Sequence, residues 1–352
     1  MTAAESSRGA EPGKVGPYLA DALGDGRWAQ CTTTLIAGGK SNLTYLVASE
    51  AGEVVLRRPP LGHVLPTAHD MRREARVMSA LAPTAVPVPR VLAAEASPDL
   101  LGQPFYVMAK VEGHVARESL PPGYADAVQE RRAVGEGLVD VLVDLHAVDH
   151  REVGLEAFGK PEGFLERQVR RWVGQWEASK VEELPALDAL AADLTARIPA
   201  SGAAGIVHGD YRLDNCLLDP ATPGRIAAVL DWELSTVGDP LVDLGLLLVY
   251  WTQEGDDPAS GAGLPCVTCL PGMPTRLDVA ERYAARSGRD VDDLPWYAAY
   301  GAFKLAVILA GVAMRARGGS MLGDGFDGLA ERVPVLVDLG RSALADGVGG
   351  AR

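Results

Sequence analysis

The chain has 352 residues, of which 47% are hydrophobic and 23% are charged. This composition is typical of a folded protein that is long enough for two lobes with separate cores, and it excludes general disorder. Of the 33 basic and 47 acidic residues, 11 of each lie in residues 1–115, so residues 116–352 carry the whole net charge of −14. We expect no nucleic-acid partner, because binding phosphates requires clustered basic side chains.

Residues 1–16 lack the apolar segment and the cleavage pattern of a signal peptide. We therefore expect a disordered tail and a cytoplasmic protein. The most apolar stretches, 241–251 and 298–314, are interrupted by Asp243 and Lys304 and fall short of the roughly 20 apolar residues that cross a bilayer. No membrane partner is expected, and the sequence does not fix the oligomeric state.

Two of the four cysteines, Cys266 and Cys269, form a single CxxC pair. A structural zinc site needs four ligands, and no second pair stands at ligand spacing. We therefore expect two thiols in a loop.

Residues 17–111 are predicted to form an N-terminal lobe that begins as sheet. Strand-like runs at 28–39, 42–49 and 53–58 are separated by turn residues, which indicates an antiparallel meander. One helix follows, because apolar residues recur at helical spacing at Met71, Ala75, Met78 and Leu81. Further strands are expected within 86–96 and 104–111.

Residues 112–352 are predicted to form a larger, mainly helical C-terminal lobe. Apolar residues at helical spacing mark one long helix at Val134, Leu138, Val141, Leu142 and Leu145. The segment 206–231 reads instead as short strands and loops that end in polar residues, and more helices follow residue 275. The fold class is therefore α+β, with an antiparallel sheet and one main helix before a helical lobe.

The segment HGDYRLDN contains the candidate catalytic residues. Asn215 follows Asp210 by five residues, which is the spacing of the protein-kinase loop H-R-D-x-x-x-x-N. Asp231 follows an apolar strand 16 residues later, where kinases place a metal-binding aspartate. In such a site one carboxylate receives the proton of the attacking hydroxyl, while a separate Asn oxygen and Asp carboxylate hold Mg²⁺. We assign Asp210 as the base, and Asn215 and Asp231 as the metal ligands.

Two further residues of this loop are candidates. His208 is expected to orient the loop by hydrogen bonding. Arg212 either neutralises charge on the transferring phosphoryl group or pairs with Asp214 or Glu233, and Asp214 could equally cap a turn.

These residues resemble those of the aminoglycoside phosphotransferase and choline kinase family, whose HGDxxxxN and DWE signatures are both present. The segments VLRRPP, REARVMSAL, LVDLHAVD and STVGDPLVDLG look like the subgroup of kinase modules associated with acyl-CoA dehydrogenases. The resemblance covers nearly the whole chain. It implies a protein-kinase-like two-lobed fold.

The resemblance also implies the nucleotide contacts. The turn GGKSN, with Gly39, Lys40, Ser41 and Asn42, would cover the phosphates, although such a turn alone is more often a simple hairpin. The strand position that contacts phosphates in the family would be Arg57, or else Arg58, in place of the Lys of protein kinases.

The ion-pair partner of this arginine would be Glu74, which could alternatively pair with Arg72 or Arg76. Backbone groups near Lys110 and Glu112, with the side chain of Met108, would contact adenine. Asp239 and Asp243 look like structural acids that brace the catalytic segment. His146 is expected to be a hydrogen-bonded core histidine.

The sequence thus predicts an Mg²⁺-dependent phosphotransferase that uses ATP, with GTP possible, and acts on the hydroxyl of a small metabolite. The substrate would be a hydroxyacyl compound or an amino sugar. One alternative is a nucleotide-binding or regulatory module that has lost catalysis. A metallohydrolase is disfavoured, because His208 has no His or Cys partner at ligand spacing.

Overall fold

The structure is a computed structural model that describes residues 7–37, 42–61, 70–180, 183–256, 267–317 and 329–349. It divides into two compact units: unit 1 is 1–112 with 227–235, and unit 2 is 113–226 with 236–352. The segment 227–235 was predicted in the C-terminal lobe and belongs instead to unit 1. Its backbone is held there, because Val229 N donates to Pro87 O at 2.8 Å and Arg73 Nη2 donates to Ser235 O at 2.9 Å.

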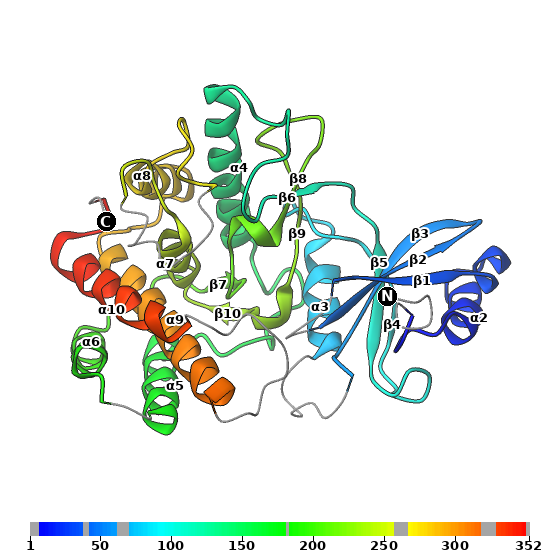
Figure 1. Cartoon of the computed structure of the whole chain (residues 1–352), viewed down its shortest axis with the longest axis horizontal. Coiled ribbons are helices and arrows are strands. Elements are labelled where there is room, and N and C mark those ends of the chain that lie inside the picture. The colour runs from blue at the N-terminus through cyan, green and yellow to red at the C-terminus, as the bar shows by residue number, and fades with distance from the viewer. Residues whose placement is uncertain are drawn as a thin grey trace. The chain divides into compact units, whose positions relative to one another are not determined.

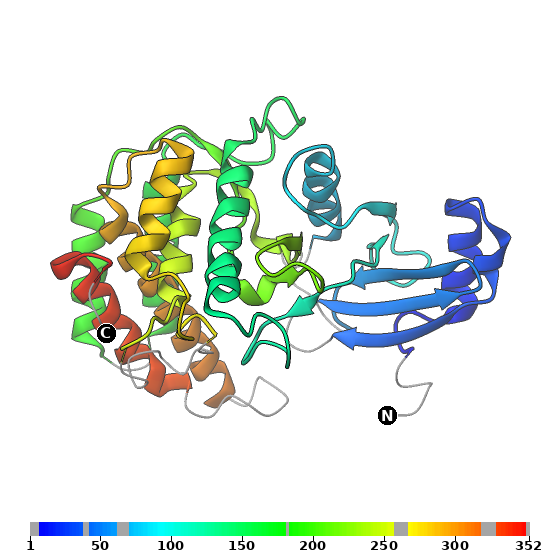
Figure 2. The same ribbon diagram turned by 90° about the horizontal axis from the view of Figure 1, so that it is seen from above.

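Unit 1 contains a five-stranded antiparallel sheet in the order β1-β2-β3-β5-β4 (Figures 1 and 2). The strands are β1 (Thr32–Ala37), β2 (Leu43–Ser49), β3 (Gly52–Arg58), β4 (Val91–Glu95) and β5 (Phe105–Ala109). Helix α3 (Met71–Leu81) begins at Asp70, whose side chain accepts hydrogen bonds from the amides of Arg72 and Arg73. The predicted meander, later strands and single central helix are confirmed.

A helix that the sequence did not predict precedes the sheet. Helix α2 (Pro12–Ala22) packs Val15 and Leu19 into the core that the sheet side chains form. The tail predicted over residues 1–16 is therefore wrong from Ser7 onward, and residues 1–6 lie outside the described part of the chain. The helix signal is weakened by prolines and glycines, but Gly16 is needed, because a Cβ there would lie 2.6 Å from Ala29 O.

The two arginines of β3, Arg57 and Arg58, are consecutive, so their side chains point to opposite faces of the sheet. Val54 and Leu56 belong to the core that contains α2, and Arg58 on the same face donates to Gly9 O and to Leu101 O. Arg57 must point to the opposite face, where it meets α3. Arg58 therefore stabilises the core of unit 1, whereas Arg57 faces the candidate site.

Unit 2 is mainly helical (Figure 1). Its helices are α4 (Val128–Ala147), α5 (Phe164–Ser179), α6 (Pro185–Ala196), α7 (Leu241–Tyr250), α8 (Arg276–Ser287), α9 (Leu294–Arg317) and α10 (Leu329–Asp346). Helix α9 packs against α7, α10 and α5, and α4 packs against α8. Gly245 permits the close approach of α7 to α9, because a Cβ there would lie 2.4 Å from the backbone of Tyr297.

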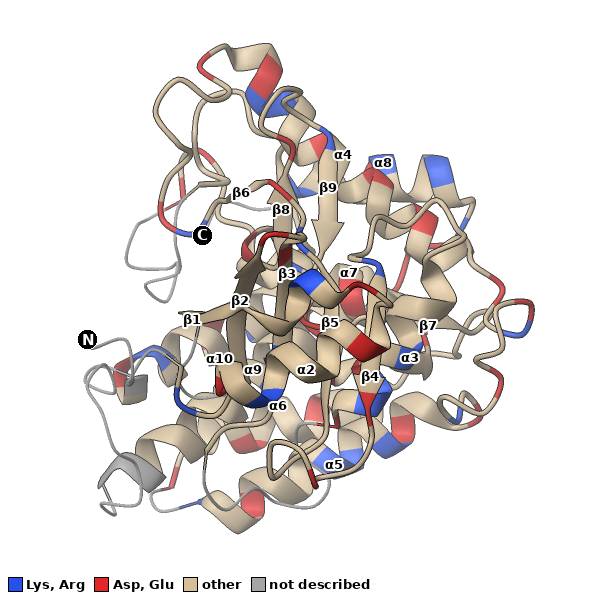
Figure 3. Cartoon of the chain, turned by 90° about the vertical axis from the view of Figure 1, so that its right-hand side faces the viewer, with Lys and Arg blue, Asp and Glu red and all other residues tan. Residues whose placement is uncertain are grey.

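Short strands in unit 2 support the catalytic segment. Strand β7 (Gly205–Val207) pairs with β10 (Thr236–Gly238), and β6 (His114–Val115) pairs with β8 (Cys216–Leu218). Strand β9 (Ile226–Val229) leads into the segment that belongs to unit 1. Acidic and basic residues alternate along the ribbons of α4, α5 and α8 (Figure 3).

One helix of unit 2 is apolar over a long stretch. Residues Leu294–Met314 of α9 are long and apolar enough to cross a membrane by length and composition, but 56% of the most apolar window is buried inside the protein. A helix buried to this extent is typical of the core of a folded domain.

The cysteines differ from the two loop thiols that the sequence predicted. Cys269 is disulfide-bonded, whereas Cys31 and Cys216 are free. Cys266 lies outside the described residues.

Candidate active site

In unit 1 the candidate site is centred on Arg57. Its Nε lies 2.9 Å from Glu74 Oε2, and its Nη2 lies 2.5 Å from Asp231 Oδ1. The predicted pairing with Glu74 is confirmed, and the alternative pairing of Glu74 with Arg72 or Arg76 is not the one formed. Arg57 thus bridges the predicted ion-pair partner and the carboxylate predicted to bind metal.

Glu74 is almost fully enclosed, with 1% of the residue exposed. Tyr106 Oη donates to its Oε2 at 3.0 Å, and Asn42 Nδ2 donates to its Oε1 at 2.9 Å. Burial raises the pKa of Glu74 to about 7, and the neighbouring Arg57 guanidinium opposes that rise. Its charge therefore depends on the pairing with Arg57.

Asn42 is the one described member of the predicted phosphate-covering turn, because Gly39, Lys40 and Ser41 lie outside the described residues. The residue is 5% exposed, and its Nδ2 also donates to Glu233 Oε2 at 3.1 Å. Its Oδ1 is buried and has no hydrogen-bond partner in the described chain. Asn42 therefore fixes the acidic side chains from its amide nitrogen and leaves an oxygen acceptor unused.

The predicted adenine contacts occupy the end of β5 and the segment after it. Met108 is 8% exposed and packs in the sheet. The Lys110 ammonium pairs with Glu53 and with Glu112, each at 2.6 Å. The Lys110 side chain is therefore held by two carboxylates, and the contact predicted for this segment is made by its backbone.

In unit 2 a buried carboxylate holds the catalytic loop. Asp243 Oδ2 accepts the amide of His208 at 2.6 Å, and Oδ1 accepts the amide of Gly209 at 2.8 Å. Gly209 has a φ of +88°, which a residue with a side chain rarely adopts. The chain therefore turns sharply after β7 and presents Asp210, and Asp243 is the brace that the sequence predicted.

Two histidines support this arrangement. His208 Nδ1 accepts the backbone amide of Asp210 at 3.2 Å, which is the orienting role predicted for it. His146 is buried, with Nδ1 2.8 Å from Tyr283 Oη and Nε2 3.3 Å from Asp243 Oδ2. It is the core histidine that the sequence predicted.

Asp210 and Asn215 meet directly. Asn215 Nδ2 donates to the Asp210 carbonyl at 2.8 Å and to its Oδ2 at 3.0 Å. Burial raises the pKa of Asp210, while Arg212, His208 and Lys304 act in the opposite direction. A carboxylate with a raised pKa is a better proton acceptor, and 27% of this side chain remains exposed.

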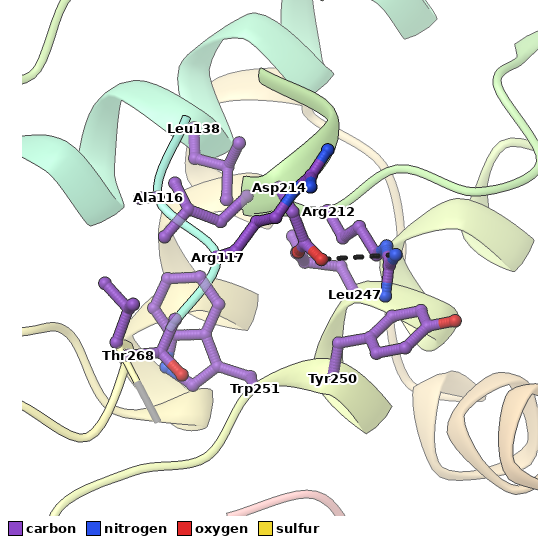
Figure 4. Close-up of a pocket in the computed structure, with 11 residues that line it drawn as sticks. Ala116, Arg117, Leu138, Arg212, Asp214, Leu247, Tyr250, Trp251 and Thr268 are labelled. Carbon is purple, nitrogen blue, oxygen red and sulfur yellow. Dashed lines mark ion pairs between the residues drawn. The ribbon is translucent and has the colours of Figure 1, made fainter. Parts of the chain in front are cut away.

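Arg212 belongs to the catalytic loop through several contacts. Its Nη2 lies 3.2 Å from Asp214 Oδ2, its Nε lies 3.7 Å from Asp210 Oδ2, and the guanidinium stacks 4.7 Å above the ring of Tyr250. The pairing with Asp214 was one of the two predicted alternatives. Arg212 therefore pairs with Asp214 (Figure 4) and lies beside Asp210, the predicted base.

Lys304 on α9 is a site residue that the sequence analysis did not find. Its ammonium donates to the Gly209 carbonyl at 2.8 Å and lies 5.9 Å from the ring of Trp172. The only sequence signal was a single charge inside an otherwise apolar helix. Such a charge requires a local partner, and here the partner is the backbone of the catalytic loop.

Each of the two residues predicted to hold magnesium, one in each unit, has an oxygen available for a ligand. Among the residues described there is no group of three or more His, Cys, Asp or Glu side chains that could hold a metal by themselves. Mg²⁺ needs no such cage, because it binds one or two protein oxygens together with substrate phosphates and water. Asn215 uses its nitrogen toward Asp210, so its Oδ1 remains for a ligand, and 28% of the Asp231 side chain is exposed.

The fold is that of a kinase-like phosphotransferase. A family model described as "Phosphotransferase enzyme family" matches residues 32–294, and the chain belongs to this family. It is 36% identical over 279 residues to acyl-CoA dehydrogenase family member 10 of Mus musculus and 36% identical over 296 residues to member 11 of Rattus norvegicus. These matches cover 79% and 83% of the chain but only 26% and 38% of the relatives, so the chain spans about a third of their length.

Solved structures confirm the predicted fold. A crystal structure from Ralstonia eutropha that is assigned to the aminoglycoside phosphotransferases superposes with a TM-score of 0.81 at 30% identity, covering 95% of this chain and 98% of that one. Aminoglycoside phosphotransferase APH(4)-Ia, solved as a ternary complex with AMP-PNP and hygromycin B, superposes with a TM-score of 0.61 at 18% identity, covering 94% and 98%. The latter likeness shows the fold alone.

Proposed function

We propose that this protein transfers the γ-phosphoryl group of ATP to a hydroxyl group of a small molecule. The observation that carries the proposal is the contact of Asn215 Nδ2 with Asp210 Oδ2 at 3.0 Å. It fixes the orientation of a partly exposed carboxylate and leaves the amide oxygen of Asn215 for a metal.

In this reaction the acceptor oxygen forms a bond to the γ-phosphorus, and the bond from that phosphorus to the bridging oxygen of ADP breaks. The hydroxyl proton passes to the Asp210 carboxylate and from there to solvent. Arg212 stands 3.7 Å from that carboxylate and contributes positive charge beside the reacting group. Asp243, His208 and Lys304 keep the loop in place through its backbone.

The nucleotide side of the reaction falls to Arg57, Asn42, Asn215 and Asp231. Arg57 would contact the phosphates, held by Glu74 as the strand lysine of protein kinases is held by its glutamate. Asn215 and Asp231 would hold Mg²⁺, which neutralises phosphate charge when bound. Arg57 pairs with Oδ1 of Asp231, which leaves Oδ2 of that carboxylate for the metal.

The proposal agrees with what is bound in structural relatives. APH(4)-Ia has been solved with AMP-PNP or ADP together with hygromycin B. For this chain we favour a hydroxyacyl acceptor over an amino sugar, because the curated relatives are named as acyl-CoA dehydrogenases. We place the reaction in the cytoplasm, where ATP is available.

The direct test measures transfer of label from γ-³²P-ATP or γ-³²P-GTP to hydroxyacyl-CoAs, free hydroxy acids and aminoglycosides. The wild-type protein should label at least one acceptor with ATP, and Asp210→Asn should lower the rate by at least about a hundredfold while nucleotide binding persists. Asp193→Asn, an exposed aspartate on α6, is the matched control and should be fully active. A wild-type protein that binds MgATP but labels no acceptor would support the non-catalytic alternative instead.

A further inference from the structure

Asp231, one of the two predicted metal ligands, has an unusual backbone conformation. Its φ is +64° and its ψ is +61°, in the left-handed region that residues with a side chain rarely adopt. Such a conformation costs free energy and persists only where the surrounding contacts hold it. The contacts of the neighbouring residues therefore decide where the Asp231 carboxylate points.

The segment that contains this aspartate is tied to unit 1 at every second residue. Arg57 of β3 pairs with the aspartate itself at 2.5 Å. Asn42, which precedes β2, donates from Nδ2 to Glu233 Oε2 at 3.1 Å. Arg73 of α3 donates to the carbonyl oxygen of Ser235 from Nε at 3.2 Å and from Nη2 at 2.9 Å. Three separate parts of unit 1 therefore hold positions 231, 233 and 235.

Asn42 closes these contacts into a ring. Its Nδ2 also donates to Glu74 Oε1 at 2.9 Å, and Glu74 in turn pairs with Arg57 at 2.9 Å. The members of the ring are Asp231, Arg57, Glu74, Asn42 and Glu233. Asn42 is 5% exposed and Glu74 is 1% exposed, so both are firmly enclosed. Glu233 is thus tied to a rigid point, and this tie limits how far the backbone of Asp231 can turn.

The charges in this ring favour a cation at Asp231. The ring contains three carboxylates, those of Glu74, Asp231 and Glu233, and one guanidinium, that of Arg57. Asn42 is a neutral donor, so it holds two of the carboxylates without cancelling the negative charge that attracts a divalent ion. The carboxylates also repel one another at short range, so each needs a contact that keeps it in place. The amide group of Asn42 provides such a contact for Glu233.

We propose that Glu233 is a positioning residue for the metal site. By its hydrogen bond with Asn42 it holds Asp231 in the conformation that presents Oδ2 to Mg²⁺. Glu233 acts through Asp231 and does not itself bind the metal or the nucleotide. The inference rests on the phosphotransferase activity proposed above and assigns a role to the last residue of the DWE segment.

The test measures how much Mg²⁺ tightens the binding of ATP, as the ratio of the Kd for ATP without Mg²⁺ to the Kd with Mg²⁺. Calorimetry gives both values. Glu233→Ala should lower this ratio about tenfold, because Asp231 loses its orientation, and should change the Kd without Mg²⁺ by less than about twofold. Loss of a purely structural contact would lower stability and leave the ratio unchanged. Glu233→Gln keeps an acceptor for Asn42 and should lower the ratio by about threefold at most.

Two further measurements show whether Glu233 acts through Asn42. The double variant Asn42→Ala/Glu233→Ala should have the same ratio as Asn42→Ala alone, because a residue that acts through another adds nothing once that other is removed. In the nucleotide-free protein, the backbone amides of residues 231–235 should exchange hydrogen faster in Glu233→Ala than in the wild type. This second readout depends neither on metal nor on activity.

Glu95→Ala is the matched control, because Glu95 is also a half-buried glutamate of unit 1 and accepts one hydrogen bond, from Ser97 N at 2.8 Å. It should keep the wild-type ratio. The proposal is overturned if Glu233→Ala behaves like Glu95→Ala, if Glu233→Gln loses as much as Glu233→Ala, or if the losses in the double variant add. Each of these outcomes leaves the phosphotransferase activity standing. A wild-type protein whose affinity for ATP does not depend on Mg²⁺ would overturn both proposals.

Discussion

Replacing Asp243 by alanine should remove the hydrogen bonds that hold the catalytic loop and lower the free energy of unfolding. The carboxylate is fully buried and accepts two backbone amides, at 2.6 Å from His208 and 2.8 Å from Gly209. Each hydrogen bond to a charged group contributes about 1.5–3 kcal/mol, so removing both should cost about 3–6 kcal/mol. Domains have free energies of unfolding of about 5–15 kcal/mol, so the loss is a large fraction of the total.

Urea denaturation, followed by tryptophan fluorescence, measures this loss. Asp243→Asn is the second variant to compare. Its amide oxygen can still accept one of the two backbone N–H groups, whereas its NH₂ group cannot accept the other. It should lose about half as much stability as Asp243→Ala. The reasoning would be refuted if Asp243→Ala cost less than about 1 kcal/mol, since two unpaired buried amides cannot be that inexpensive.

Three other variants address separate contacts. Burial lowers the pKa of His146 below its ordinary value of 6.5, so below that pH the unfolded chain binds more protons than the folded one. The free energy of unfolding should therefore fall as the pH drops below about 6.5. His146→Gln should flatten this dependence on pH, and an equal dependence in both proteins would contradict the reasoning. Lys304→Met removes the donor to the Gly209 carbonyl and should lower kcat about tenfold with an unchanged Kd for MgATP. Steady-state rates measure kcat, and calorimetry measures the Kd. An unchanged kcat would show that Lys304 does not support the site. Glu74→Gln leaves Arg57 with a weaker anchor and should raise the KM for MgATP about tenfold, whereas an unchanged KM would show that the ion pair does not position the arginine.

The contact between Asp210 and Asn215 in the catalytic loop could be predicted from their spacing in the sequence. Asp210 and Asn215 are five residues apart, and the short 3-10 turn that follows Arg212 brings them into contact, so the motif alone was sufficient. The choice of Arg57 over Arg58 could also have been made from sequence, because consecutive strand residues face opposite sides and the apolar residues Val54 and Leu56 share the parity of Arg58.

Contacts over long sequence separations were beyond that kind of reasoning. Lys304 lies 95 positions after Gly209, and nothing in a local pattern connects them. Helix α2 has a weak helical signal, because prolines and glycines interrupt it, and its order comes from burial of Val15 and Leu19 against the sheet. The assignment of 227–235 to unit 1 likewise depends on hydrogen bonds to residues more than 100 positions earlier.

Magnesium-dependent nucleotide binding tests the central claim most directly. A thermal-shift titration should be run with ATP and GTP, with and without Mg²⁺, on the wild-type protein and on Asp231→Ala. Ligand at about 100 times its Kd stabilises the folded state by about 2.7 kcal/mol, so the wild-type protein should show a clear rise in Tm with MgATP. The account predicts that this rise needs Mg²⁺ and is lost in Asp231→Ala. No rise with either nucleotide, or an equal rise in the variant, would contradict it.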